Sequence, residues 1–182
     1  EASYPSDFFD VVSLFEVLEH LPDPSSDLKE ICRILKPDGL LCLSVPNLAS
    51  WERVLFGKWW NGLDAPRHLY QFTPRTLGRL MKAANFTILE LKSVNAYQIQ
   101  VNRGRLDYCK DSLRFFLRDM GLYPQKKLEW DQNPQSNTTP KTKAGWKRGF
   151  NLIENSFFYP LWLIGRITDC DNTLWACGQK RK

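Results

Sequence analysis

Two apolar runs joined by a single amphipathic helix place the strongest constraint on the fold of this chain. Residues 8–15, FFDVVSLF, and residues 40–46, LLCLSVP, are apolar at nearly every position, which is typical of strands covered on both faces of a sheet. Between them one helical face is formed by Leu28, Ile31, Cys32 and Leu35. A strand, a helix and a second strand in this order predict a parallel β-α-β unit with a right-handed crossover, and therefore an α/β fold.

Capping and turn residues set the limits of this unit. Asp23 is placed to cap the helix, with Pro24 at its first position. The sequence KPDG at residues 36–39 predicts a turn before the second strand. Pro46 is expected to end that strand because proline cannot donate to a sheet ladder.

Further helices and strands are predicted downstream. Thr73 is expected to cap a helix that begins at Pro74, and Asn85 to end it in a left-handed conformation. The other predicted elements are a short helix over 49–56, a strand over 86–94, an amphipathic helix over 105–120, a polar loop over 131–145, an apolar helix over 146–167 broken at Pro160, and a last strand over 172–179.

Composition narrows the class of protein. Of the 182 residues 43% are hydrophobic, which is enough for one domain with a core. The formal net charge of +5 is too small to indicate a nucleic-acid partner. The five cysteines include no Cys-x-x-Cys pair, and Cys32 and Cys42 lie in apolar patterns. We interpret these two as buried thiols of a cytoplasmic protein and predict neither disulfides nor a metal site. No apolar run approaches the roughly 20 residues of a membrane span.

Three segments in order carry a resemblance to a known family. They are FDVVSLFEVLEHLPDP, LKEICRILKPDGLLCLSVPN and RHLYQFTPRTLGRLMKAANFTILEL. Together they resemble the second half of a class I S-adenosylmethionine-dependent methyltransferase, in the branch that includes the ubiquinone-biosynthesis methyltransferases. The match runs from Phe8 to about Val94, and NTLWACGQK resembles the family's final strand.

The resemblance implies a partial doubly wound, Rossmann-like methyltransferase sheet made of the later strands of the seven-stranded fold. Residues 1–95 would be the C-terminal part of the catalytic core. Residues 96–168 would be a largely helical insertion before the last strand, and residues 169–182 that strand and a basic tail.

The family's donor-binding features have no counterpart here. No two of the ten glycines are separated by one residue, so the Gly-x-Gly loop that begins the cofactor site is absent. We therefore expect the C-terminal part of a methyltransferase, which by itself would not bind S-adenosylmethionine. The alternatives are a non-catalytic remnant or interaction module that lacks the donor site, and a membrane-associated module.

The loop after the first strand is the expected site. Ligands of open parallel sheets bind beyond the carboxyl ends of the strands. By the resemblance, Phe15, Glu16 and Val17 would contact S-adenosylmethionine there. If the loop were helical, Glu16 and His20 would share a face. His20 and His68 are the candidate catalytic bases. The alternative for both is structural: Glu19 and His20 would fix the loop's shape, and Arg67 and His68 would anchor a lid.

The acceptor is expected to be a small molecule methylated at oxygen, and to be hydrophobic or lipid-linked. Candidate substrate contacts are Asn47, Trp51, Trp59 and Arg67, with Trp60 beside them. Asn47 could instead cap the following helix, and the tryptophans could be core. Basic and then aromatic residues over 146–167 suggest a peripheral membrane contact, although a helix that covers the sheet is the alternative. The strand at residues 8–15 would have a free edge, which predicts self-association.

Overall fold

The computed structural model of the protein describes residues 3–94, 107–121 and 170–181. The predicted polar loop over 131–145, the predicted membrane element over 146–167 and most of the predicted insertion lie outside these residues. The boundaries proposed for the insertion therefore stay predictions. Among the described residues no helix is long and apolar enough to cross a membrane.

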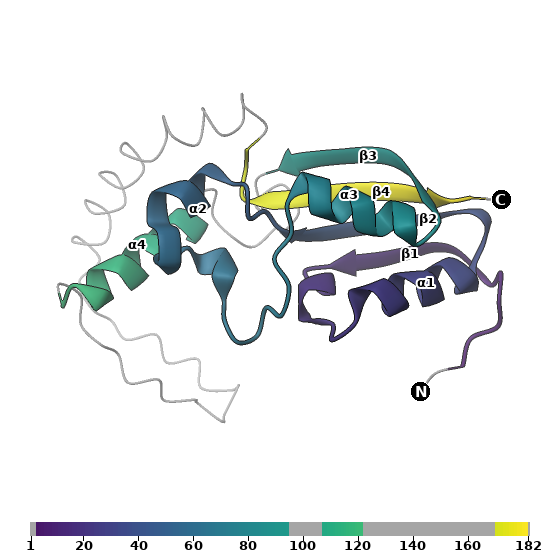
Figure 1. The fold of residues 1–182 in the computed structure, drawn as a ribbon, viewed down its shortest axis with the longest axis horizontal. Coiled ribbons are helices and arrows are strands. Elements are labelled where there is room, and N and C mark those ends of the chain that lie inside the picture. The colour runs from purple at the N-terminus through teal and green to yellow at the C-terminus, as the bar shows by residue number, and fades with distance from the viewer. Residues whose placement is uncertain (1–2, 95–106, 122–169, 182) are drawn as a thin grey trace, which may run out of the picture.

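Four strands form one sheet in the order β1-β2-β4-β3 (Figure 1). Strand β1 (Phe9–Phe15) pairs in parallel with β2 (Leu35–Pro46), as the apolar runs predicted. Strand β4 (Thr173–Lys180) lies antiparallel between β2 and β3 (Phe86–Val94). The predicted α/β class is confirmed, and the last strand of the chain lies inside the sheet.

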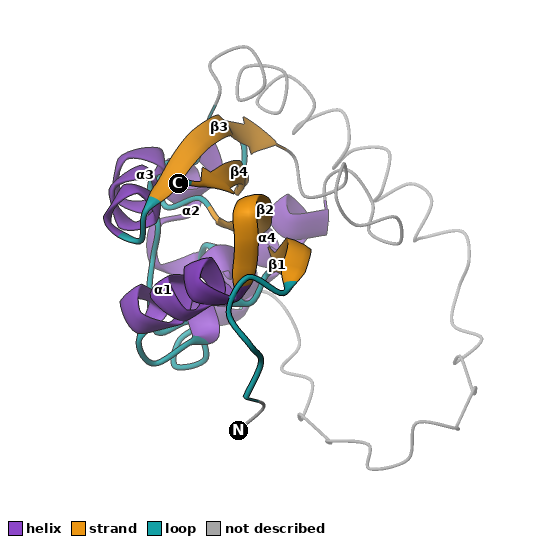
Figure 2. Ribbon diagram, turned by 90° about the vertical axis from the view of Figure 1, so that its right-hand side faces the viewer, coloured by secondary structure: helices purple, strands orange, loops and turns teal. Residues whose placement is uncertain are grey.

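Two capped helices cover one face of this sheet. Helix α1 (Pro24–Ile34) begins after Asp23, whose carboxylate accepts a hydrogen bond from the Ser26 amide. Helix α3 (Pro74–Ala83) begins after Thr73, which forms a reciprocal capping box with Thr76. Figure 2 shows both helices on the same side of the strands. Both starts were predicted because capping side chains act locally.

The main core lies between these helices and the sheet. Its fully buried members include Leu28 of α1, Leu77 and Met81 of α3, and Leu41, Leu43, Phe86 and Leu174 of the strands. Gly178 of β4 lets α3 approach closely, since a Cβ there would lie 2.8 Å from the Met81 methyl carbon. Asn85 ends α3 with φ of 68°, the left-handed stop that the sequence predicted.

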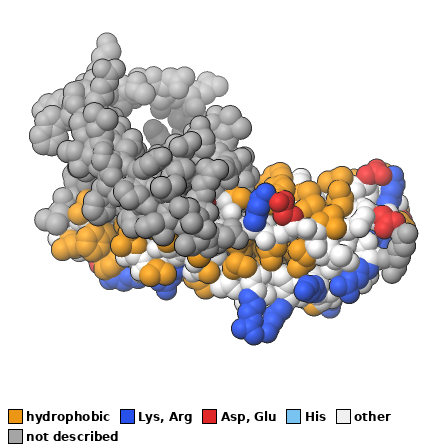
Figure 3. Space-filling view, turned by 90° about the horizontal axis from the view of Figure 1, so that it is seen from above, with side chains coloured by type: hydrophobic (Ala, Val, Ile, Leu, Met, Phe, Trp, Pro, Cys, Tyr) orange, Lys and Arg blue, Asp and Glu red, His pale blue; other side chains and the backbone are white. Residues whose placement is uncertain are grey.

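Helices α1 and α3 both leave the opposite face of the sheet uncovered (Figure 2). The described helices leave Val11 54% and Phe15 48% exposed on β1, so the prediction that β1 is covered on both faces is wrong for this structure. On this face Phe15 of β1, Ser44 of β2 and Trp175 of β4 are neighbours in the strand register. The Phe15 and Trp175 rings stack over Ser44 with their centroids 5.8 Å apart. Hydrophobic side chains also reach the surface among charged ones when the molecule is seen from above (Figure 3).

Two local predictions needed correction. The KPDG segment at residues 36–39 is part of β2, where the register with β1 shifts between Phe9 and Val11. Asp38 has φ of 65°, so the turn residues form an irregularity in the strand. The short helix α2 (Trp51–Phe56) begins later than predicted because the Ser50 hydroxyl caps it by accepting from the Arg53 amide. Helix α4 (Asp107–Asp119) agrees with the prediction.

The free edge of β1 gives a first testable expectation. Within the described residues β1 pairs only with β2, and such an edge is a template for another strand. We expect the 182-residue chain to self-associate in size-exclusion chromatography with light scattering. Val11→Lys should shift it toward the monomer, since an edge lysine opposes pairing. Val54→Lys is the matched control, because Val54 is 81% exposed on α2. A stable wild-type monomer would contradict the prediction.

Candidate functional site

Strand β1 ends in a strained residue that is tied to β2. Glu16 has φ of 54°, a left-handed conformation that costs a non-glycine residue about 1–2 kcal/mol. Its backbone amide donates to the Ser44 carbonyl, and its carboxylate accepts from the Ser44 hydroxyl at 3.0 Å. The next turn is only a 3₁₀ helix, η1 (Leu18–His20). Glu16 therefore bonds β2 and does not form the predicted helical pair with His20.

The two histidines of the chain lie together at the end of η1. Their ring centroids are 4.7 Å apart. The His20 Nδ1 lies 2.9 Å from the Arg67 carbonyl, and the His68 Nδ1 lies 2.8 Å from the Gly62 carbonyl. A carbonyl can only accept, so each neutral ring carries its proton on Nδ1 and leaves a lone pair on Nε2.

Both free nitrogens face a buried carboxylate. The Glu19 Oε1 lies 3.9 Å from the His20 Nε2 and 4.0 Å from the His68 Nε2. Glu19 is fully buried, and neither carboxylate oxygen has a hydrogen-bond partner among the described residues. Burial raises the pKa of Glu19 from 4.5 to about 7, aided by the nearby Glu16. A second carboxylate, Asp64, lies 3.8 Å from the His68 Nε2.

The loop that carries His68 is fastened over this carboxylate. The Glu19 carbonyl accepts hydrogen bonds from the amides of Leu69 and Tyr70, at 2.9 and 3.2 Å. The amide of His68 donates to the Asp64 carbonyl. Because these bonds join η1 to the residues before α3, they bring together histidines that are far apart in the sequence.

The Glu19, His20 and His68 side chains, here called the Glu19 cluster, can hold a divalent cation. Their three candidate ligand atoms lie within 4.8 Å of one another. Histidines that bind metal usually donate the other ring N–H to a carbonyl or carboxylate, and both rings do so here. The Glu19 carboxylate, which has no hydrogen-bond partner among the described residues, supplies negative charge for the cation. Sequence reasoning predicted no metal site, since no Cys/His spacing indicated one.

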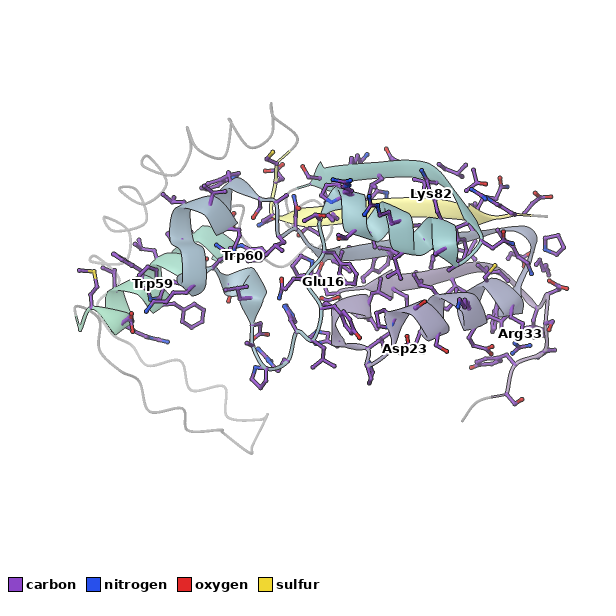
Figure 4. The ribbon with its side chains drawn as sticks, viewed as in Figure 1. Glu16, Asp23, Arg33, Trp59, Trp60 and Lys82 are labelled. Atoms are coloured by element: carbon purple, nitrogen blue, oxygen red, sulfur yellow. The ribbon has the colours of Figure 1, made fainter. Side chains whose placement is uncertain are left out.

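The predicted cofactor residues lie at the carboxyl end of β1. Phe15 is 48% and Val17 37% exposed, so the loop presents free surface on both sides of Glu16. Glu16 itself points back toward the strands (Figure 4). This placement at the ends of parallel strands fits a ligand that binds beyond the sheet, and the assignment to S-adenosylmethionine contacts stays a prediction.

The predicted substrate residues do not form one group. Asn47 is buried, with its amide nitrogen donating to the Asp171 carbonyl and its amide oxygen accepting from the Ala49 amide. Trp51 is half-buried, and its indole nitrogen has no hydrogen-bond partner among the described residues. Arg67 is exposed and forms an ion pair with Asp64 at 2.6 Å.

The other two tryptophans predicted to contact the substrate, Trp59 and Trp60, belong to the helical end of the molecule. The Trp59 indole N–H donates to Asp119 of α4, and its ring packs edge-on against Phe116. Trp60 is buried beside Phe56 in a second, smaller core. Figure 4 shows both tryptophans on the side of α2 and α4, away from Glu16. Roles in substrate binding stay predictions for all these residues.

Comparison with known proteins identifies the family. The sequence profile of a family described as a methyltransferase domain matches residues 1–91, which is half of the chain.

The chain belongs to the methyltransferase domain family.

Similarity to curated relatives gives this methyltransferase domain its branch. It is 30% identical over 100 residues to a ubiquinone biosynthesis O-methyltransferase of Aeromonas salmonicida, covering 52% of this chain and 42% of the relative. It is 47% identical over 51 residues to the enzyme of the same name from Haemophilus ducreyi, covering 27% of this chain and 22% of the relative. The methyltransferase domain is therefore of class I, related to the ubiquinone branch. The matches span less than half of either relative's length.

Solved structures confirm the Rossmann-like fold of the methyltransferase domain. A phosphoethanolamine N-methyltransferase 2 of Haemonchus contortus in complex with S-adenosyl-L-methionine aligns with a TM-score of 0.51 at 12% identity, covering 99% of this chain and 35% of that one. A putative methyltransferase of Bacillus halodurans aligns with a TM-score of 0.50 at 14% identity, covering 100% of this chain and 68% of that one. At these identities the likeness shows the fold alone.

Proposed function

We propose that this methyltransferase domain takes part in the transfer of a methyl group from S-adenosylmethionine to a hydroxyl of a small acceptor. One observation carries the proposal beyond family membership. It is the buried, unpaired Glu19 carboxylate that faces the Nε2 atoms of His20 and His68, beside the end of β1. An unpaired buried carboxylate costs stability, and such costs are concentrated at functional sites.

The reaction makes one demand that this cluster meets. The acceptor oxygen attacks the methyl carbon, the carbon–sulfur bond breaks, and its electron pair stays on the sulfur of S-adenosylhomocysteine. The hydroxyl proton must leave as the new bond forms. The lone pair on the His68 Nε2 can accept that proton, and the Glu19 carboxylate at 4.0 Å stabilises the imidazolium.

A second hypothesis explains how the acceptor hydroxyl loses its proton. In it, Glu19, His20 and His68 hold a divalent cation. When bound, a cation would lower the pKa of an acceptor hydroxyl by polarising its oxygen. The residues fit this role because both imidazole lone pairs and the unpaired carboxylate converge. In either case the chain's own task is to fix the two rings through the carbonyls of Gly62 and Arg67.

The identity of the acceptor is part of the proposal. The names of the curated relatives support O-methylation. Exposed Arg67 could pair with an anionic group of the acceptor, and Trp51 could contact its apolar part. A lipid-linked acceptor and a peripheral membrane contact through residues 146–167 stay proposals.

Donor binding is the first test. We expect no measurable S-adenosylmethionine affinity for the 182-residue chain in isothermal titration calorimetry, because the family's Gly-x-Gly loop is absent from its sequence. The longest open reading frame that contains these residues should bind the donor and transfer a labelled methyl group to a small hydroxyl acceptor. Micromolar donor affinity of the 182-residue chain would contradict the first expectation. Donor binding without methyl transfer to any hydroxyl acceptor would favour the non-catalytic alternative.

A further inference from the structure

Two cysteines lie side by side on the face of the sheet opposite α1 and α3. Cys42 of β2 and Cys177 of β4 are directly opposite in the antiparallel register, and their sulfur atoms are 3.7 Å apart. The sequence predicted Cys42 to be a buried thiol. Cys32 is buried as predicted, whereas Cys42 and Cys177 are both only half-buried.

We propose that Cys42 and Cys177 form a reversible redox pair that closes to a disulfide across β2 and β4. This inference goes beyond the proposed function and does not depend on it. It rests on the register of β2 and β4, on the distance between the two sulfur atoms and on the access of reagents to both thiols.

The strand geometry already suits the bond. Directly opposed residues of an antiparallel pair have Cα atoms about 4.5–5.5 Å apart, within the range of about 4.4–6.8 Å that disulfides occupy. Closing the bond requires the sulfurs to move from 3.7 Å to about 2.0 Å. Rotation of the two side chains is sufficient, and the backbone ladder between Leu41 and Leu43 on β2 can stay in place.

The half-buried position of both thiols gives reagents access. Leu41 and Leu43, which flank Cys42 in β2, are fully buried under the helices. Because side chains alternate along a strand, Cys42 points to the other face. The row beyond the cysteines contains Phe15 and Trp175, which stack over Ser44. The pair therefore lies on a half-buried surface beside an aromatic contact, outside the main core.

The chemistry needs an external oxidant, and a small-molecule disulfide suffices. One thiolate attacks the small disulfide, which releases one small thiol and leaves a mixed disulfide on the protein. The second protein thiol attacks that mixed disulfide, releases the second small thiol and forms the Cys42–Cys177 bond. Two protein thiols are oxidised and one small disulfide is reduced to two thiols.

The environment of Cys177 suggests the order of attack. Burial raises the pKa of its thiol to about 11, with a further contribution from the hydrogen-bonded Cys42 thiol. Its thiolate is therefore scarce at neutral pH, which suits the second, intramolecular attack at short range better than the first encounter. Cross-linking should accordingly be faster at pH 9 than at pH 7.

The test is oxidation of the 182-residue chain in glutathione buffers of defined ratio. After alkylation, mass spectrometry should show the loss of two reactive thiols, and peptide mapping should find one disulfide between Cys42 and Cys177. Because the bond closes a loop of well over 100 residues, the melting temperature should rise by about 5–15 °C. Reduction should reverse both changes.

Serine variants complete the test. Cys42→Ser and Cys177→Ser should each prevent the intramolecular bond and the rise in melting temperature. Cys32→Ser is the matched control and should show the same disulfide and the same rise in melting temperature on oxidation, since Cys32 is buried in α1, away from the pair. Peptide mapping of the wild-type disulfide tests the proposal even if a serine variant fails to fold. Retention of both thiols in an oxidising buffer, or a disulfide that joins any other pair of the five cysteines, would overturn the proposal.

Discussion

Replacing His68 with alanine is expected to lower methyl transfer by about 10²–10⁴-fold, the usual contribution of a general base. Donor affinity should be retained, because His68 lies in the loop before α3 and the predicted donor contacts follow β1. The effect should exceed that of His20→Ala. The His68 side chain is 11% exposed and lies 4.0 Å from Glu19, whereas the His20 side chain is 41% exposed.

A conservative variant separates catalysis from structure at this position. In His68→Asn the side-chain amide can replace Nδ1 as donor to the Gly62 carbonyl, but it has no lone-pair nitrogen at the place of Nε2. We expect His68→Asn to fold like the wild type and to be nearly as inactive as His68→Ala. Turnover would be measured with the longest reading frame and a small hydroxyl acceptor. Near-wild-type turnover in His68→Ala and His20→Ala would leave both histidines with structural roles only.

Replacing Glu19 with glutamine should stabilise the metal-free protein and weaken metal binding. The folded-state pKa of Glu19 is about 7, above the value of 4.5 for an unperturbed glutamate. The folded state therefore holds this proton more tightly than the unfolded state. The ionised carboxyl lowers stability above pH 7, and this penalty disappears as the pH falls from 7 to 4.5.

The expected gain for Glu19→Gln is about 1–3 kcal/mol at pH 8 and close to zero at pH 4.5. Denaturant titration in the presence of a chelator would measure it at both pH values. Glu30→Gln is the control, because Glu30 is an exposed ion-pair partner of Arg33. Ion pairs on the surface contribute little to the free energy of unfolding. Equal stability of Glu19→Gln and wild type at pH 8 would contradict the burial argument.

The same variant tests the metal hypothesis. Removing the carboxylate from the Glu19 cluster takes away its only charged ligand, so affinity for Zn²⁺ or Mg²⁺ should fall at least 10-fold to 100-fold. His20→Ala and His68→Ala should weaken binding as well. If the wild type binds neither cation in calorimetry, the metal hypothesis fails and the general-base hypothesis remains.

The sequence by itself determined the local elements of this protein. The two apolar runs predicted β1 and most of β2, and a strand was also predicted where β3 lies. The caps Asp23 and Thr73 predicted the starts of α1 and α3. These signals work because periodic burial and capping hydrogen bonds depend on residues a few positions apart. Three sequence segments in order, which include EVLEH and LKPDG, were also enough to indicate the family.

Only the tertiary structure decided which side chains meet. The exposure of Val11 and Phe15 depends on α1 and α3 both packing on the other face, which no strand pattern can show. The contact between Cys42 and Cys177 depends on β4 entering the sheet next to β2.

The Glu19 cluster was beyond sequence reasoning for the same reason. EVLEH places Glu19 and His20 in one loop, and the sequence could therefore nominate His20. It could not show that the loop carrying His68 closes over Glu19, buries its carboxylate and leaves that carboxylate unpaired. Burial and pairing are properties of the space around a group, and that space is made by segments distant in the chain.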